Sequence, residues 1–351
     1  MLIQIIAVII VFGGIVVIHE AGHFISARSI GIAVQEFAVG VGPAVFKGES
    51  KGTLYSVRAL PCGGFCLFDP EIEGTDHRGR VLSLTKRDAW TKIFVSVSGP
   101  LMNFLLAAFL FTMLFSIIGV AVGYEPVIGV VHPDSAAFEA GIQPGDRILS
   151  IEGENLAAWQ DLSRILTERQ EQGLLHFTIQ RGQTQITIPV TPRWNEEENR
   201  VMIGVSVDTQ CVVTERVSPA QGIRLGLKQT RMMIEALISS ILQMMTGRIS
   251  VSENLSGPVA LIQVIGETAS DGIADLLFLT AFLSVNLGIM NLLPFPALDG
   301  GRIVMYLLEL LRRKPLAQEV ESIINAVGFV LLISLMAILT FRDIARLFGG
   351  Q

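Results

Sequence analysis

Charged residues are scarce in this chain. Asp, Glu, Lys and Arg make up 17% of its 351 residues, whereas about 25% is typical of a soluble domain. Half of the residues are hydrophobic, and the mean hydropathy is +0.55. This composition predicts that a large part of the chain lies in a membrane, with the lipid bilayer as a partner.

Basic residues and cysteines are few as well. Lys and Arg number 26 against 32 acidic residues, a net charge of −6, so no nucleic acid is expected as a partner. The three cysteines, Cys62, Cys66 and Cys211, are too few for a disulfide framework. Cys62 and Cys66 have no second pair to complete a four-ligand metal site. We expect them to be small apolar residues, with a structural metal clip as the alternative.

Charge is absent altogether from four apolar runs, and a transmembrane helix needs about 20 such residues. The runs are Met1 to Ile18, Ile93 to Tyr124, Leu276 to Leu298 and Ile323 to Phe341. The first run lacks the basic start and the small-residue cleavage site of a signal peptide. We therefore expect it to be a retained helix that continues through His23 and Phe24. The sequence predicts a polytopic α-helical membrane protein with about four transmembrane helices.

Lysine and arginine gather in two of the connections between these runs. The first connection holds Arg28, Lys47, Lys51, Arg58, Arg78, Arg80, Lys86, Arg87 and Lys92, and the third holds Arg302, Arg312, Arg313 and Lys314. The positive-inside rule places both connections in the cytoplasm. The N-terminus, the long central section and the C-terminus are then expected outside, although Arg342 and Arg346 count against this orientation.

The first connection contains two strand-like segments, Ile32 to Phe46 and Thr53 to Phe68, with the break Pro61-Cys-Gly-Gly64 in the second. Lipid offers no partners to backbone groups, so we expect a membrane-associated β-hairpin region, residues 32–68, that dips into the membrane domain. The following polar stretch, Asp69 to Asp88, is expected to be a surface loop.

The central section reads as an α+β domain. Strands are expected at 127–131, 176–180 and 185–190, and helices at 135–140 and 159–169. The segment Ala140 to Ile151, Ala-Gly-Ile-Gln-Pro-Gly-Asp-Arg-Ile-Leu-Ser-Ile, resembles the PDZ family, which implies a groove that binds a peptide end by strand addition. The alternative is a purely structural spacer. Ser218 to Gly247 is expected to be an amphipathic helix, either at the membrane surface or packed on the PDZ-like domain.

These features divide the chain into four parts. They are the first half of the membrane domain (1–124), the inserted PDZ-like domain (125–214), an amphipathic helix with a linker (215–272), and the second half of the membrane domain (273–351).

The motif His19-Glu20-Ala21-Gly22-His23 ends the first apolar run. On a helix, the two histidines lie on one face and can reach one zinc ion, and the glutamate can deprotonate a water molecule. Soluble sequences contain this pattern by chance, as two surface histidines. Ionisable side chains at the end of an apolar run are costly unless they pair or bind a metal, and this position favours a zinc site.

A catalytic zinc ion takes three ligands from the protein, so we expect a third ligand from another apolar run. Asp299 ends the third run and is followed by Gly300 and Gly301, which permit close approach of the backbone. The distribution of basic residues puts Asp299 on the same side of the membrane as the two histidines. The alternative is that Asp299 only caps a helix that begins near Arg302.

Together these motifs resemble the site-2 protease family of intramembrane zinc metalloproteases. The resemblance rests on H-E-x-x-H in the first run, on N-x-x-P-x-P-x-x-D-G from Asn291 to Gly300, and on the inserted PDZ-like domain. The bacterial regulator-of-sigma-E type is the most similar branch. The segments Gly99 to Phe104 and Leu255 to Val259 also resemble family segments. This chain has one PDZ-like domain, where the best-known Gram-negative members have two.

The resemblance implies that His19, His23 and Asp299 bind Zn²⁺. Glu20 would then be the general base and afterwards the proton donor to the leaving amine. It also implies a set of substrate-binding residues: Asn291, Asn286, Pro294 and Pro296 in the third run, and Gly63, Gly64 and Phe65 in the hairpin. Asn291 would hydrogen-bond the substrate backbone or the developing oxyanion, while Asn286 is better suited to tying helices together.

The Thr53 to Phe68 hairpin is similar to the family's membrane-re-entrant β element, whose edge would pair with an extended substrate. The implied substrates are single-span membrane proteins, either anti-sigma factors after a first cut or remnant signal peptides, in regulated intramembrane proteolysis. The implied location is the bacterial inner membrane, with the active site near the cytoplasmic face and the PDZ-like domain extracytoplasmic.

Two alternatives remain open. The first is an inactive membrane protein that binds peptides through its PDZ-like domain, and the presence of all of His19, Glu20, His23 and Asp299 argues against it. The second is a metal-ion transporter with intramembrane ligands. Transport needs neither a general base nor a strand that pairs with a substrate, so the glutamate and the hairpin favour a protease.

Overall fold

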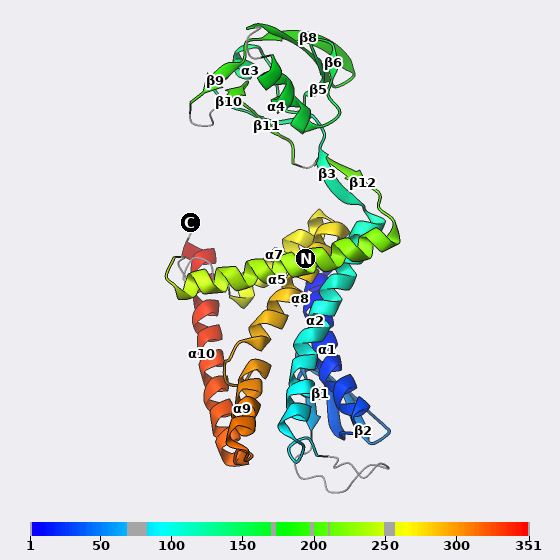
Figure 1. Ribbon diagram of the computed structural model, residues 1–351, viewed down its shortest axis with the longest axis vertical. Helices are drawn as coiled ribbons and strands as arrows, with labels where there is room; N and C mark the ends of the chain where they lie inside the picture. The colour runs from blue at the N-terminus through cyan, green and yellow to red at the C-terminus, as the bar shows by residue number, and fades with distance from the viewer. Residues whose placement is uncertain are drawn as a thin grey trace. The chain divides into compact units, whose positions relative to one another are not determined.

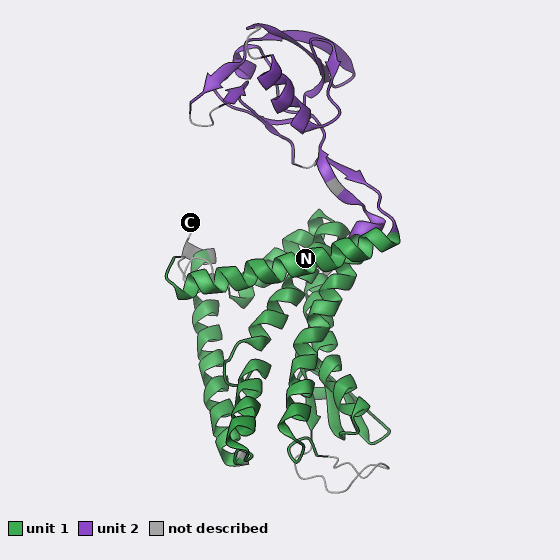
Figure 2. Ribbon diagram, in the orientation of Figure 1, with its two compact units in different colours: residues 1–114, 219–351 green, residues 115–218 purple. Residues whose placement is uncertain are grey.

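The computed structural model describes residues 2–68, 83–169, 173–196, 200–209, 211–248 and 257–349. The chain forms two compact units, shown in different colours in Figure 2: unit 1, residues 1–114 and 219–351, and unit 2, residues 115–218. Three sequence features lie outside the described residues: positions 69–82 of the expected polar loop, Leu255 of the Leu255 to Val259 segment, and the side chain of Cys62.

Unit 1 is built mainly from helices (Figure 1). Its helices are α1 (Leu2–Ser29), α2 (Ala89–Ile117), α5 (Pro219–Met245), α7 (Pro258–Asp271), α8 (Ile273–Leu292), α9 (Asp299–Arg312) and α10 (Gln318–Gly349). Of these, α1, α2, α8 and α10 are long and apolar enough to cross a membrane. Large side chains on them are exposed, for example Ile10 at 66% and Phe329 at 60%. Such surfaces suit lipid and not water, and the prediction of a multi-pass membrane protein is confirmed at this level.

The second apolar run is not helical throughout. Helix α2 ends at Ile117, and Gly119 follows with a φ of 102°, a conformation that favours glycine. Val120–Tyr124 then form strand β3, which pairs with β12 (Val212–Glu215). The prediction of one span reaching Tyr124 is therefore wrong at its end, because this apolar stretch contributes to a sheet.

The third apolar run also leaves the helix early. Helix α8 ends at Leu292, just before Pro294 and Pro296. Proline cannot donate a backbone hydrogen bond and disfavours helical backbone at the residue before it. Residues 293–298 therefore form an irregular segment that leads into the start of α9.

Strands β1 (Val34–Ser50) and β2 (Thr53–Phe68) form the hairpin region of unit 1, and β1 starts two residues later and ends four residues later than the expected strand. Both strands bend, so residues 34–39 pair with residues 64–68 and residues 36–39 also pair with 54–57. Strand β2 packs along α1. A buried cluster of Ala27, Ile32, Val34 and Val95 joins the hairpin to α1 and α2.

Two further helices lie against the membrane-length helices. Helix α5 runs across α2 and α8 (Figure 1), with Gly226 packed against the backbone of Ala108 and Thr112. Helix α7 packs on α1 and α10, and its start is held by Asp343, which accepts hydrogen bonds from the backbone of Gly257 and Ala260. The described residues of the stretch 215–272, expected as one helix and a linker, thus contain the two helices α5 and α7.

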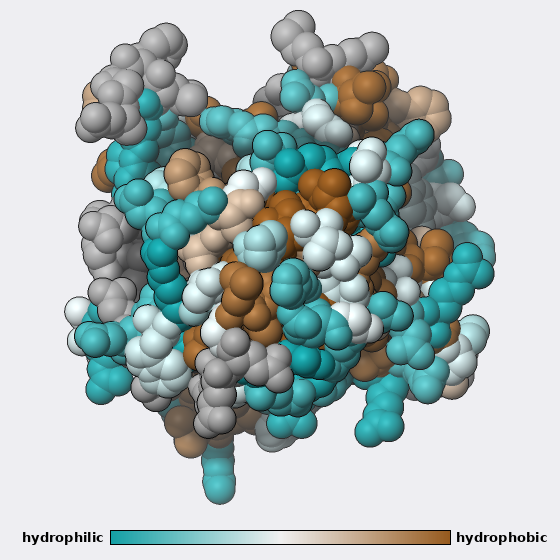
Figure 3. Space-filling model, turned by 90° about the horizontal axis from the view of Figure 1, so that it is seen from above, coloured by the Kyte–Doolittle hydropathy of each residue, from teal (hydrophilic) through white to brown (hydrophobic). Residues whose placement is uncertain are grey.

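The described residues of unit 2 form short strands and two helices. Its elements are β3, β4 (Ile128–Val131), α3 (Ala136–Glu139), β5 (Arg147–Ile151), β6 (Glu154–Asn155), α4 (Trp159–Glu168), β7 (Leu175–Arg181), β8 (Thr184–Val190), β9 (Arg193–Asn195), β10 (Arg200–Met202), β11 (Val205–Val207) and β12. One sheet has the order β6-β5-β7-β8, and β11 pairs with β4. Its core includes the fully buried Ile148, Ile165 and Phe177. Figure 3 shows the whole molecule from above: hydrophilic residues cover much of the described surface on this face, and hydrophobic residues gather near its middle.

Candidate metal centre

Three side chains of unit 1 converge on one point. The Nε2 atoms of His19 and His23 lie 3.3 Å apart, and Asp299 Oδ2 lies 3.1 Å from His19 Nε2 and 3.3 Å from His23 Nε2. All three residues are buried, with 6–8% of their surface exposed. They form a group of ligand atoms that could hold one metal ion.

These atoms fit zinc in geometry and in chemistry. Ligand atoms at about 2.0–2.1 Å from a tetrahedral zinc ion lie about 3.3–3.4 Å from one another, close to the separations found here. The Nδ1 atom of His23 donates a hydrogen bond to Val95 O at 2.8 Å, so a neutral ring carries its lone pair on Nε2. That lone pair faces a carboxylate and a second imidazole at short range, an arrangement that a cation stabilises. Two nitrogen atoms and one oxygen atom match a catalytic zinc site that keeps one position open.

Helix α1 places the two histidines one turn apart, and small residues let α2 approach them. A Cβ atom added to Gly22 would lie 2.8 Å from the backbone carbon of Ser98, and one added to Gly99 would lie 2.9 Å from Cε1 of His19. Real Cβ atoms are essentially never found under 3.0 Å from such neighbours. Both glycines therefore allow the α1–α2 contact that the site requires.

The first turn of α9 supplies Asp299, and the segment before it is tightly folded. Ala297 has a φ of 73°, which is unusual for a residue other than glycine, and its backbone donates to Asn325 Oδ1 at 3.3 Å. A Cβ atom on Gly301 would lie 2.8 Å from the carbonyl carbon of Phe295. Pro296 packs against Gly328 of α10. Gly301, Pro296 and Gly328 thus permit the close packing of the loop that brings Asp299 to the histidines.

A cavity of about 250 Å³ opens beside the three ligand atoms. It is lined by Glu20 next to the histidines, by Phe65 and Cys66 of β2, by Asn291 of α8 and by Arg302 of α9. The cavity beside the candidate metal centre is thus lined by the carboxylate of Glu20, by the amide of Asn291, which can hydrogen-bond a peptide, and by strand β2.

The other residues expected to contact substrate, Gly63, Gly64, Asn286, Pro294 and Pro296, are not among the described residues that line this cavity. Gly64 packs against Ala38, with Glu20 nearby, and Gly63 has a φ of 106° and lies beside Val41. Asn286 is half-buried in α8, and Pro294 is exposed.

Two contacts at the histidines were not singled out from the sequence. Val95 O accepts from His23, and the Asn103 side chain lies 3.3 Å from Nδ1 of His19. Both residues belong to α2, and Asn103 is completely buried. A signal existed for Asn103, because it lies in the Gly99 to Phe104 segment that resembles a family segment. A backbone carbonyl such as that of Val95 leaves no trace in the sequence.

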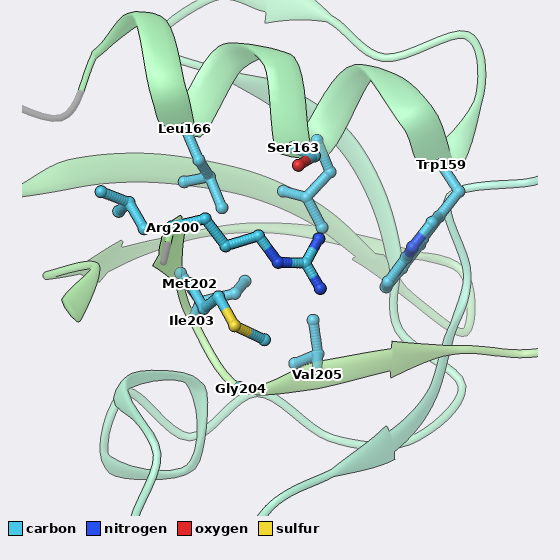
Figure 4. A pocket seen from close by; sticks show the side chains of 10 residues that line it. Trp159, Ser163, Leu166, Arg200, Met202, Ile203, Gly204 and Val205 are labelled. Atoms are coloured by element: carbon cyan, nitrogen blue, oxygen red, sulfur yellow. The ribbon is translucent and has the colours of Figure 1, made fainter. Parts of the chain in front are cut away.

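Unit 2 has a groove of its own, shown in Figure 4. It lies between α4, with Trp159, Ser163 and Leu166, and the segment 200–205. The Arg200 side chain extends along the groove toward Trp159, and Met202 and Val205 face it from the strand side (Figure 4).

Comparisons with known proteins match nearly the whole chain. Residues 7–335 match the model of Peptidase family M50. The zinc metalloprotease RasP of Bacillus licheniformis is 31% identical over 424 residues, covering 98% of this chain and 99% of that protein. The regulator of sigma-W protease RasP of Bacillus subtilis is 30% identical over 422 residues, covering 98% and 99%. A protein of Clostridium perfringens is 36% identical over 97% of this chain and 98% of its own length. Among solved structures, the PDZ domain of an SdrC-like protein from Listeria monocytogenes matches 26% of this chain and 96% of its own, with 17% identity and a TM-score of 0.23.

Proposed function

We propose that this chain hydrolyses peptide bonds within or near the transmembrane segments of single-span proteins. The premise is its family: the chain belongs to peptidase family M50, the site-2 proteases, and is a zinc metalloendopeptidase. One observation carries the proposal. The ligand atoms of His19, His23 and Asp299 lie within 3.3 Å of one another, beside Glu20, in a unit whose helices are long enough to span a membrane. In this proposal the three residues hold the zinc ion.

Zinc at this position would act as a Lewis acid that activates water and polarises the scissile carbonyl. Glu20 lines the same cavity and is the general base, which takes the proton of the attacking water and then delivers it to the leaving amine. Asn291 of α8 also lines the cavity. Its amide would donate a hydrogen bond to the substrate carbonyl as negative charge develops on its oxygen.

A helical substrate has its carbonyl groups hydrogen-bonded within the helix, so it has to unwind before attack. Residues 64–68 of β2 pair with residues 34–39 on one side, and Phe65 and Cys66 line the cavity. The opposite edge of this segment would pair with the unwound substrate, as in peptide binding by strand addition. New backbone hydrogen bonds then offset part of the cost of unwinding.

The distribution of basic residues supports an orientation in the bacterial inner membrane. With the Arg- and Lys-rich connections in the cytoplasm, the metal centre lies near the cytoplasmic face and unit 2 is extracytoplasmic. The Bacillus subtilis relative is named a regulator of sigma-W protease. We infer that an anti-sigma factor already shortened outside the membrane is the substrate class, with remnant signal peptides as the second candidate.

Unit 2 is the proposed PDZ-like domain, and its groove is the site for a peptide end. Apolar residues of α4 and of residues 200–205 line the groove, and Arg200 brings a positive charge to it. A peptide ending in an apolar residue and a free carboxylate has the matching chemistry, so the groove would recognise the end created by a first cut.

The test uses the full chain, purified in detergent with zinc. We expect it to cut a single-span protein inside its apolar segment and to lose this activity with a zinc chelator. A soluble unfolded protein without such a segment serves as the control substrate and is expected to stay intact. Cleavage of the soluble control alone would contradict the proposal, and no cleavage of either substrate would favour the inactive binding protein or the transporter.

A further inference from the structure

The carboxamide of Asn103 touches a proposed zinc ligand and is itself incompletely hydrogen-bonded. Asn103 is fully buried on α2, and its Nδ2 atom lies 3.3 Å from Nδ1 of His19. Its Oδ1 atom is buried without a hydrogen-bond partner among the described residues. A buried amide oxygen without a partner is costly, so this arrangement needs an explanation.

An amide with Nδ2 toward His19 also conflicts with metal binding by that residue. If Nδ2 donates to Nδ1, a neutral His19 ring carries its proton on Nε2. That nitrogen is the one that lies 3.1 Å from Asp299 Oδ2 and 3.3 Å from His23 Nε2. A proton there would occupy the lone pair that a zinc ion requires.

A half-turn of the amide removes the conflict, because the two ends of an asparagine side chain have nearly the same shape. Oδ1 then faces His19 Nδ1 and accepts its proton, and the lone pair of Nε2 points toward Asp299 and His23. His23 already has this arrangement, since its Nδ1 donates to Val95 O.

We propose that Asn103 is a positioning residue whose side-chain oxygen accepts a hydrogen bond from Nδ1 of His19 and so presents Nε2 to the zinc ion. Helix α2 then orients both rings, through the carbonyl of Val95 and the side chain of Asn103. Ser284 of α8 donates to the backbone carbonyl of Asn103 at 2.8 Å and does not touch its carboxamide. The inference rests on the proposed function, because it takes His19 as a zinc ligand.

The experiment compares Asn103→Leu with Asn103→Asp in the full chain, by zinc affinity in competition with a chelator. Leucine has a similar size and lacks an acceptor, and we expect a loss of about 10- to 100-fold, the range typical of residues that orient a metal ligand. Aspartate keeps an acceptor oxygen, and its affinity is expected to equal or exceed that of the wild type. Ser284→Ala is the matched control: it removes a buried hydrogen bond to Asn103 but leaves the amide, so its affinity is expected to stay close to the wild type.

Three outcomes would overturn the inference: wild-type affinity in Asn103→Leu, an equal loss in Asn103→Asp and Asn103→Leu, or an equal loss in Ser284→Ala. If Asn103→Leu does not fold, Asn103→Asp decides alone, because lost affinity there means that the N–H groups are what matters. His19→Ala in the same assay separates this inference from the proposed function. If His19→Ala binds zinc with the same affinity as the wild type, His19 is not a zinc ligand and the proposed metal site is refuted.

Discussion

Gly99 of α2 lies against the imidazole ring of His23 on α1: a Cβ atom at Gly99 would be 2.6 Å from Cε1 of that ring. The same atom would be 2.9 Å from Cε1 of His19. The absence of a side chain at one position thus permits both proposed ligands to stand where they do.

Gly99→Ala is expected to lose zinc and activity together, because the added methyl group has to displace one or both histidine rings. The measurement is the zinc content per chain by mass spectrometry, with the thermal stability of the protein alongside. Gly14→Ala is the matched control on α1, where the added Cβ meets nothing within 4 Å. A Gly99→Ala protein with full zinc content would show that the rings tolerate displacement.

Asp299→Asn is expected to weaken zinc binding strongly. Loss of a residue that only orients a metal ligand typically costs about 10- to 100-fold in affinity, and the loss here is expected to be larger. The amide is neutral and is a poorer ligand than the carboxylate. Asp343→Asn is the control, because Asp343 is also a buried carboxylate but caps the start of α7. That variant should lose stability and keep its zinc, and unchanged zinc affinity in Asp299→Asn would remove Asp299 from the ligand set.

Lys92 of α2 and Glu309 of α9 form a buried ion pair at 3.0 Å, and Glu309 also accepts from the backbone of Leu316. Lys92→Met is expected to cost about 3–5 kcal/mol, because it leaves a buried charge without its partner. The double variant Lys92→Met, Glu309→Leu should recover most of this loss. Thermal unfolding of the wild type, the single variants Lys92→Met and Glu309→Leu, and the double variant in detergent tests it. A double variant as unstable as the sum of both single variants would contradict the buried pair.

Met202→Glu is expected to weaken the binding of a peptide with an apolar carboxyl-terminal residue to unit 2. The substitution puts a negative charge beside the apolar groove. We expect the Kd to become about tenfold weaker, which corresponds to a loss of about 1.4 kcal/mol of binding free energy. Fluorescence titration of the full chain with a labelled peptide measures it. Phe138→Glu is the control, because Phe138 is an exposed apolar residue of α3, 58% accessible. Equal effects of both substitutions would refute the groove as the binding site.

The topology has a test of its own. A reporter fused after Thr214 is expected to report the extracytoplasmic side, because the basic connections are retained in the cytoplasm. A matched fusion within the first connection, after Lys51, should report the cytoplasm. Exchanged signals would reverse the orientation.

The sequence could group the metal-site residues because their signals are local. His19 and His23 are one helical turn apart, and Asp299 is a charge at the end of an uncharged run. The structure adds the distances between their ligand atoms. The resemblance to the site-2 proteases, drawn from the same motifs, is confirmed by the family match over residues 7–335.

What the sequence could not supply depends on distant partners. Asn103 and His19 are 84 positions apart, and Val95 and His23 are 72 apart, so their contacts arise only when α1 and α2 pack. Hydropathy did not separate α2 from β3, because Val120–Tyr124 is as apolar as the helix before it. Its strand conformation depends on pairing with Val212–Glu215, far along the chain.

One measurement tests the central claim most directly: zinc content and cleavage of a single-span substrate, determined on the same preparation of Glu20→Gln. Glutamine keeps the size of the side chain and removes the base, and general acid–base catalysis contributes about 10²- to 10⁴-fold. We predict that Glu20→Gln holds one zinc ion per chain and that its cleavage rate is at least about 10²-fold below that of the wild-type control. Undiminished cleavage by the zinc-loaded variant would contradict the account.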